Sequence, residues 1–336
     1  MGKIVKISTL VLAAALLVVV GAGCSSGEEV EGEAEKYNIG IIQYNEHIAL
    51  DTAREGFVAA LQDNGYIDGE KIVLDYQNAQ GDQSNLSTIS DRFVSNKVDL
   101  VLAIATPAAQ AIAGKTTEIP ILATAITDFE AARLVESNEA PGCNVSGTTD
   151  MNPIKEQIDL LVKLAPEAKT VGVLYSSNED NSILQASIAK EAIEALGLTY
   201  EEATVSTSND VQQATQSIVS KCDAIYIPTD NIFASAMPVV HGVIAESKTP
   251  VICGESGMVN SGGLATLGIN YYDLGYQTGL MAVKILKGEA EPATMPIESA
   301  SGFDFAINGT VAEEIGIEIP ADLQQYVTTA EGSANK

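Results

Sequence analysis

Short clusters of polar and aromatic residues stand directly after apolar, strand-like runs at several points in this sequence. They supply carboxylates, amides, hydroxyls and rings, and their members are Gln43, Tyr44, Glu46, His47, Thr127, Asp128, Tyr175, Asn178, Asp230, Asn231, Glu255, Asn270 and Tyr271. Carboxylates accept charge-assisted hydrogen bonds from an ammonium group, and pockets for small molecules combine apolar walls with a few polar groups. This set therefore suits the non-covalent binding of a small zwitterion such as an amino acid.

The junction within residues 98–114, VDLVLAIATPAAQAIAG, is the clearest candidate for an anion site. An apolar run ends at Ala105, and Thr106 and Pro107 then open a small-residue segment with helical spacing. Thr106 is predicted as the N-cap and Pro107 as the first helical residue, where its missing N–H costs nothing. The free N–H groups of that first turn suit a carboxylate. The alternative is a well-capped helix with water on those groups.

The candidates for the opposite, ammonium-binding end are Asp128, Asp230 and Glu255. Asp230 also suits an N-cap and Asp128 a loop turn, whereas Glu255, between glycines, is harder to explain as scaffolding. The stretch GESGMVNSGG lacks the lysine and hydroxyl pair of a P-loop and is interpreted as a turn. The predicted aromatic walls are Tyr44, Tyr175, Phe233 and Tyr271.

The two histidines have different expected roles. His47 lies in a polar turn and is a possible ligand contact, whereas His241 lies in an apolar helical block and is expected to be a satisfied buried imidazole. Two distant histidines make a poor metal site. The sequence also contains no GxSxG elbow.

The elements that must position these residues alternate between strand and helix. Expected strands are 37–43, 71–77, 98–105, 119–123, 170–175, 198–203, 224–227, 250–253, 263–269 and 303–307. Expected helices are 50–64, 84–96, 106–114, 153–164, 183–196, 211–220, 232–246 and 274–286. Such alternation predicts an α/β fold with two Rossmann-like, doubly wound parallel-sheet lobes joined by a hinge. We expect residues 37–149 with about 271–299 in one lobe, 150–270 with about 300–325 in the other, and 326–336 as a tail.

The first residues predict export and anchoring. Residues 1–23 combine lysines with an apolar run and small residues, which is typical of a signal peptide. Cys24 then resembles a lipidated N-terminus, followed through residue 36 by an acidic tether. An ordinary signal peptide or an uncleaved anchor is the alternative. The net charge of −27 argues against nucleic acid and against a basic membrane patch, so the lipid would provide the anchor.

The remaining cysteines, Cys143, Cys222 and Cys253, show no CxxC spacing. Free thiols are expected, and one disulfide stays open as an alternative.

A series of motifs along the chain resembles the substrate-binding proteins of ABC transporters in the tryptophan/tyrosine family. In chain order these motifs are QYNEH, LDTAREGF, DYQNAQGDQSNL, LVLAIATPAAQAIA, AITD, PTDN and INYYDLG. The resemblance runs from about residue 37 to 298 and implies a type I periplasmic-binding-protein fold that closes on an aromatic amino acid. It implies that Thr106 and its neighbours hold one end of the ligand. It also implies that the cleft is lined by Gln43, Glu46, His47, Asp128, Asp230, Asn231 and Glu255. The sequence departs from the family pattern at Ile48 and Phe129, where proline is common.

The expected function is therefore an extracytoplasmic lipoprotein that delivers tryptophan, tyrosine or phenylalanine to an ABC permease, as a monomer and without a cofactor or covalent chemistry. Rival interpretations are a binding protein for branched-chain or other apolar amino acids and a ligand sensor for a membrane receptor. An enzyme such as a racemase would need cysteines paired in the cleft.

Overall fold

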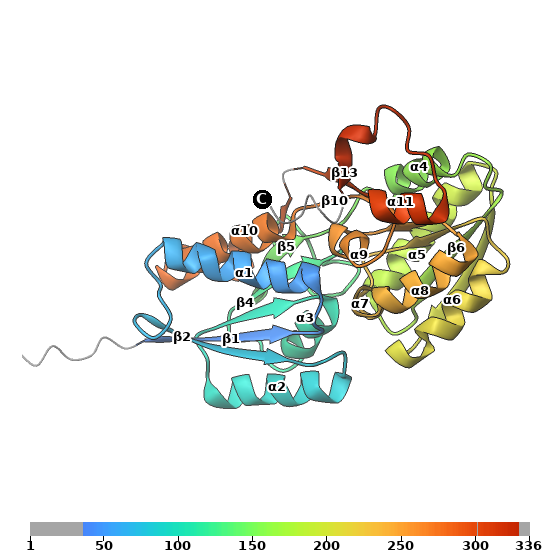
Figure 1. Cartoon of the computed structure of the whole chain (residues 1–336). Coiled ribbons are helices and arrows are strands. Elements are labelled where there is room, and N and C mark those ends of the chain that lie inside the picture. The colour runs from blue at the N-terminus through green and yellow to red at the C-terminus, as the bar shows by residue number, and fades with distance from the viewer. Residues whose placement is uncertain (1–35, 301, 329–336) are drawn as a thin grey trace, which may run out of the picture. The chain divides into compact units, whose positions relative to one another are not determined.

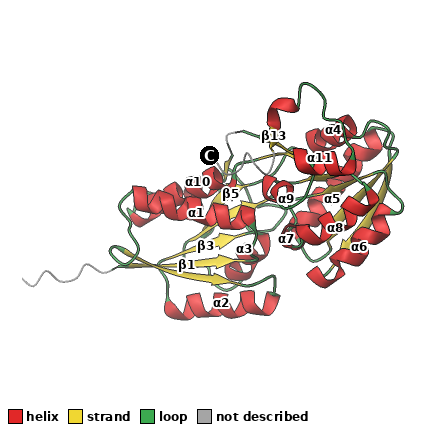
Figure 2. Cartoon of the chain, in the orientation of Figure 1, coloured by secondary structure: helices red, strands yellow, loops and turns green. Residues whose placement is uncertain are grey.

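The computed structural model describes residues 36–300 and 302–328. The predicted signal peptide, Cys24 and nearly all of the acidic tether lie outside this range, as does most of the predicted tail. Two sheets with helices on their faces make up the described chain (Figures 1 and 2). In the described part of the chain, no helix combines the length and the apolar character needed to cross a membrane.

The first sheet has the strand order β11-β5-β4-β3-β1-β2, and all its printed pairings are parallel. Its strands are β1 (Tyr37–Gln43), β2 (Ile72–Asn78), β3 (Leu100–Ile104), β4 (Ile121–Ile126), β5 (Val145–Thr149) and β11 (Glu298–Ser299). Its helices are α1 (Ile48–Asp63), α2 (Gln83–Asn96), α3 (Thr106–Ala113) and α10 (Tyr271–Leu286). In Figure 1, α1 and α10 lie on one side of this sheet and α2 and α3 on the other.

Helix α10 comes from far along the sequence, yet it packs tightly on α1 (Figure 1). Glycine permits this contact, because a Cβ on Gly275 would lie 1.8 Å from the Ala53 carbonyl oxygen, and one on Gly56 would lie 2.1 Å from that of Tyr272. The close approach fixes the start of α10, and with it Tyr271, against the first sheet.

The second sheet has the order β13-β12-β10-β9-β8-β6-β7. Its strands are β6 (Thr170–Ser176), β7 (Thr199–Val205), β8 (Ala224–Ile227), β9 (Val251–Cys253), β10 (Ala265–Gly268), β12 (Asp304–Asn308) and β13 (Val327–Thr328). Its helices are α4 (Ile154–Leu164), α5 (Asp180–Ala195), α6 (Val211–Val219), α7 (Asn231–Ser235), α8 (Met237–Ser247), α9 (Ser256–Asn260) and α11 (Gly309–Ile315). The expected two-sheet α/β fold is confirmed, with one correction: β12 runs antiparallel to β10, so this sheet is not purely parallel.

Several local expectations are wrong. No strand was expected between residues 123 and 153, but this stretch contains β5, which adds to the edge of β4. The single helix expected over 232–246 is broken at Ala236 into α7 and α8, because Pro238 has no N–H to continue the first helix. The glycine-rich turn after Gly254 contains the short helix α9. His241 is partly exposed rather than buried, with its Nδ1 3.2 Å from the Gly262 carbonyl oxygen.

The three described cysteines are free thiols. Cys222 and Cys253 are buried and Cys143 is partly buried.

Candidate functional site

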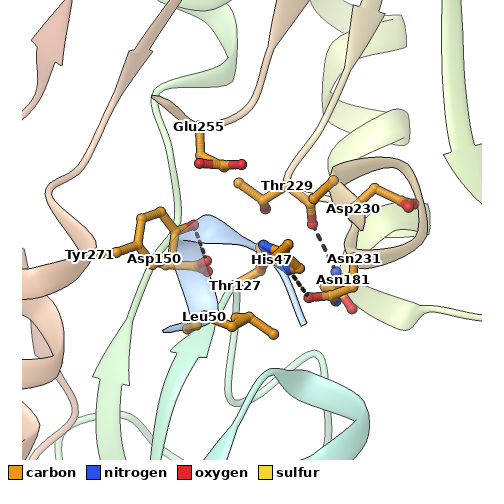
Figure 3. A pocket seen from close by; sticks show the side chains of 12 residues that line it. His47, Leu50, Thr127, Asp150, Asn181, Thr229, Asp230, Asn231, Glu255 and Tyr271 are labelled. Atoms are coloured by element: carbon orange, nitrogen blue, oxygen red, sulfur yellow. Dashed lines mark hydrogen bonds between the residues drawn. The ribbon is translucent and has the colours of Figure 1, made fainter. Parts of the chain in front are cut away.

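A pocket lies where turns after strands of both sheets meet (Figure 3). About 300 Å³ of the space between its lining residues, part of it open to solvent, is not filled by protein atoms. The residues on the first-sheet side are His47, Leu50, Ala125, Thr127, Asp150 and Tyr271. Those on the second-sheet side are Asn181, Thr229, Asp230, Asn231, Ala234 and Glu255.

Two carboxyl groups and a phenol form one end of the pocket. The Tyr271 hydroxyl donates to Asp150 Oδ2 at 2.6 Å, and Asp150 Oδ1 is buried with no partner among the described residues. Glu255 caps α9 by accepting from the backbone N–H groups of Gly257 and Met258. Burial raises the pKa of Asp150, and burial raises that of Glu255 to about 7, against the effect of those two N–H groups. Glu255 therefore has a scaffold role that the sequence did not predict, with both oxygens occupied by the cap, whereas Asp150 Oδ1 remains free to accept a hydrogen bond.

Asp230 lines the opposite wall, but its carboxylate is already occupied. Its Oδ1 accepts from the Phe233 N–H at 2.9 Å, which caps α7, and its Oδ2 accepts from the Ser176 N–H at 2.5 Å. Figure 3 shows the carboxylate turned away from the pocket centre. Behind it, burial and the charge of Asp230 raise the pKa of Glu179. Asp230 thus acts mainly as scaffold, as one of the two sequence interpretations allowed.

The two sides of the pocket are joined by direct hydrogen bonds. His47 Nε2 lies 3.1 Å from Asn231 Oδ1 (Figure 3). The buried Gln185 amide donates to Thr127 Oγ1 at 3.1 Å on one side and to Thr229 Oγ1 at 2.6 Å on the other. These bonds hold the turns of the two sheets together around the pocket.

Six of the residues expected from the sequence line this pocket: His47, Thr127, Asp230, Asn231, Glu255 and Tyr271. Ten do not: Gln43, Tyr44, Glu46, Ala105, Thr106, Pro107, Asp128, Tyr175, Asn178 and Asn270. Phe233, an expected wall, is buried in the core beside the pocket and is not among its lining residues.

Most residues outside the lining have a structural partner instead. The Gln43 amide donates to Asp51 Oδ1 at 2.8 Å, and Asp128 turns its loop by accepting from the Ala131 N–H at 2.8 Å. The Tyr175 hydroxyl donates to Glu202 on β7 at 3.1 Å. The Asn178 amide donates to the Ser206 carbonyl at 3.0 Å, and Asn270 caps α10. Of the others, Tyr44 is buried and Glu46 is exposed.

The predicted cap of α3 is displaced by one residue. Ala105 is the N-cap, with φ +81° and ψ 152°, and Thr106 is the first helical residue. This backbone conformation is nearly restricted to glycine, so Ala105 is strained. Ala125, at the end of the neighbouring strand, also has a positive φ of 56°. Thr106 Oγ1 is buried without a partner among the described residues.

Six lining residues are not among the site residues predicted from the sequence: Leu50, Ala125, Asp150, Asn181, Thr229 and Ala234. Asp150 escaped because strand β5, which it follows, was expected to be a loop. Had the run VSGTT been recognised as a strand, Asp150 would have qualified as another carboxylate at a strand end. Among the described residues, no group of three or more His, Cys, Asp or Glu side chains is arranged to hold a metal ion.

The model of the family described as "ABC transporter substrate binding protein" matches residues 38–330. The chain belongs to this family. Its members are solute-binding proteins and not enzymes, so the chain acts outside the cytoplasm as the small-molecule-binding component of an ABC transporter.

Three relatives are similar to this chain over nearly their whole length. The "Tyrosine-binding protein" of Clostridioides difficile (strain R20291) is 40% identical over 337 residues, covering 98% of this chain and 97% of that protein. A crystal structure of an ABC domain with L-Trp, from Streptococcus pneumonia, is 40% identical and has a TM-score of 0.84, covering 88% of this chain and 99% of that one. A ligand-free, open substrate-binding protein with adhesive properties, from Clostridium difficile, is 46% identical over the same shares but has a TM-score of only 0.66.

Proposed function

We propose that the pocket binds an aromatic α-amino acid, which the protein delivers to an ABC permease. The main support is that the lining residues have hydrogen-bond acceptors without a partner. These buried atoms are Asp150 Oδ1, Asn181 Oδ1 and His47 Nδ1. Neither lysine nor arginine is among its lining residues. A ligand carrying a cationic donor fits this site, and the two ligand-named relatives indicate an aromatic amino acid.

We assign the ligand ammonium to Asp150 rather than to Glu255, whose two oxygens accept from the backbone N–H groups of Gly257 and Met258. Asp150 Oδ1 has a free lone pair, whereas both oxygens of Asp230 are occupied by backbone N–H groups. Leu50, Ala125 and Ala234 supply the apolar wall. Thr106 remains the predicted carboxylate contact although it is not among the lining residues of the pocket, since its hydroxyl is buried without a partner in the described chain at the start of α3.

We further propose that the sheets form two lobes, residues 37–149 with about 271–299 and residues 150–270 with about 300–325, that close on the ligand. The open relative has the higher identity and the lower TM-score, as expected if lobe arrangement rather than sequence separates the structures. Closure excludes water and strengthens the polar contacts, and the ligand favours it only by binding the closed form more tightly.

The proposal also includes the predicted signal peptide, lipidation of Cys24 and a monomer tethered to the membrane. Mass spectrometry of the membrane fraction tests the anchor: a diacylglycerol-modified Cys24 peptide is expected, and an unmodified one refutes it.

Calorimetric titration with tyrosine, tryptophan, phenylalanine and leucine tests the binding function. At least one aromatic amino acid is expected to bind more tightly than leucine. A wild-type protein that gives neither heat nor a thermal shift with any aromatic amino acid refutes the proposal, and tighter binding of leucine favours the apolar alternative.

A further inference from the structure

Three polar side chains form a hydrogen-bonded row that ends at the pocket. His47 is the N-cap residue of α1, Asn231 begins α7 and Glu179 precedes α5. His47 Nε2 lies 3.1 Å from Asn231 Oδ1, and Asn231 Nδ2 donates to Glu179 Oε2. The row joins the turns of the two sheets.

Glu179 determines which way the Asn231 amide faces. The same Glu179 oxygen also lies 3.4 Å from the Asn231 backbone nitrogen, whose N–H can only donate, so this oxygen is an acceptor. The side-chain NH₂ of Asn231 must then face Glu179, and its carbonyl oxygen must face His47. A carbonyl oxygen only accepts, so the proton of the imidazole sits on Nε2.

The orientation of the row leaves His47 Nδ1 as a bare acceptor. Burial lowers the pKa of His47, which favours the neutral ring with a lone pair on Nδ1. Nδ1 is shielded from solvent and has no partner among the described residues. The residue makes no side-chain cap bond to α1, so helix capping does not use this atom. A buried acceptor without a donor is costly, and a ligand that supplies the donor removes that cost.

We propose that His47 determines specificity within the binding function proposed above: its Nδ1 accepts a hydrogen bond from the donor on the ligand's aromatic side chain, the phenol O–H of tyrosine or the indole N–H of tryptophan. Phenylalanine has no such donor. Its binding leaves Nδ1 unpaired in a dry pocket, and sites of this kind reject the analogue that lacks the donor. Asn231 and Glu179 are positioning residues, because they act by holding the imidazole tautomer.

Three variants test the role of His47. His47→Leu removes the acceptor, whereas His47→Asn keeps a side-chain oxygen near the position of Nδ1. His241→Gln is the matched control, because it replaces the other histidine of the chain, which lies outside the pocket. Each is titrated with tyrosine, tryptophan and phenylalanine by calorimetry, and thermal unfolding without ligand checks that it is folded.

Wild type and His241→Gln are expected to bind tyrosine or tryptophan at least about tenfold more tightly than phenylalanine. His47→Leu loses that preference, and His47→Asn regains part of it. Equal affinities of wild type for all three ligands overturn the proposal, as does an equal loss of all three in His47→Leu. Both results leave aromatic binding intact, whereas failure of wild type to bind any of the three refutes the proposed function itself.

Nitrogen NMR of histidine-labelled protein checks the tautomer independently of affinity. His241→Gln leaves a single histidine, so assignment is direct. A protonated Nε2, an unprotonated Nδ1 and a shift of the Nδ1 signal on adding the donor-bearing ligand are expected. A protonated Nδ1 in the ligand-free protein overturns the proposal.

Discussion

Replacing Asp150 by asparagine tests the assignment of the ammonium contact. The amide of the Asp150→Asn variant keeps an oxygen that can accept from the Tyr271 hydroxyl, now 2.6 Å from Asp150 Oδ2. The change removes the negative charge and places an NH₂ group at the position of Oδ1, which is buried without a partner among the described residues. The side chain thus keeps its shape, while the acceptor at the Oδ1 position is replaced by a donor.

The expected loss follows from one charged contact. A hydrogen bond to a charged group contributes about 1.5–3 kcal/mol, which corresponds to about 10- to 150-fold in affinity. The ligand-free protein is expected to be at least as stable as wild type at pH 8, because burial raises the pKa of Asp150 and ionising it inside the protein is unfavourable. Binding and stability should therefore change in opposite directions.

Calorimetric titration with tyrosine and tryptophan at pH 8 measures the affinity, and thermal unfolding without ligand measures the stability. Asp128→Asn is the matched control: it removes the same charge from a partly buried loop residue outside the pocket. Its affinity should stay within about twofold of wild type. Binding by Asp150→Asn within twofold of wild type would show that the ammonium lies elsewhere.

Three further outcomes are expected. Asp230→Ala removes the cap of α7 and should lower the free energy of unfolding, measured in urea, by about 1–2 kcal/mol. Its amino-acid affinity, measured by calorimetry, should change by threefold or less; a larger loss would show that Asp230 contacts the ligand directly. The pKa of Glu255 rises from 4.5 to about 7 on folding, so the folded ligand-free protein retains a proton that the unfolded chain releases. The free energy of unfolding should therefore fall as pH rises from 4.5 to 7, by about 3 kcal/mol for this group, and Glu255→Gln should flatten the urea-denaturation pH profile; identical profiles contradict the shift. Ala105→Gly should raise the free energy of unfolding by about 1 kcal/mol by relieving a backbone conformation that favours glycine, whereas Ala103→Gly, on the regular strand β3, should lower it.

The local sequence pattern was sufficient to predict the limits of strands whose apolar runs have clear ends. Strands 37–43 and 224–227 have the predicted limits, because each is an apolar run flanked by polar or turn residues. Strand β5 was missed, since VSGTT is short and polar and becomes a strand by pairing with β4. The helix break at Ala236 was missed although Pro238 signals it, because the apolar spacing continues across the break.

Part of the site was also predictable from the chain alone. Residues after parallel strands gather at one edge of a sheet, and this rule identified His47, Asp230 and Glu255. It could not identify Asp150, because the strand before it, β5, forms by pairing with β4 and has no strong local signal.

The sequence by itself determined the alternation of strands and helices, the resemblance to a binding-protein family and the group of turns from which the pocket is built, because these depend on local periodicity and residue type. Only the tertiary structure decided which polar atoms remain free to meet a ligand. The carboxylate of Asp230 is occupied by the backbone N–H of Ser176 as well as that of its own helix, whereas one oxygen of Asp150 is left without a partner among the described residues. That difference depends on which N–H and O–H groups distant segments bring within hydrogen-bonding distance, and no pattern along the chain specifies it.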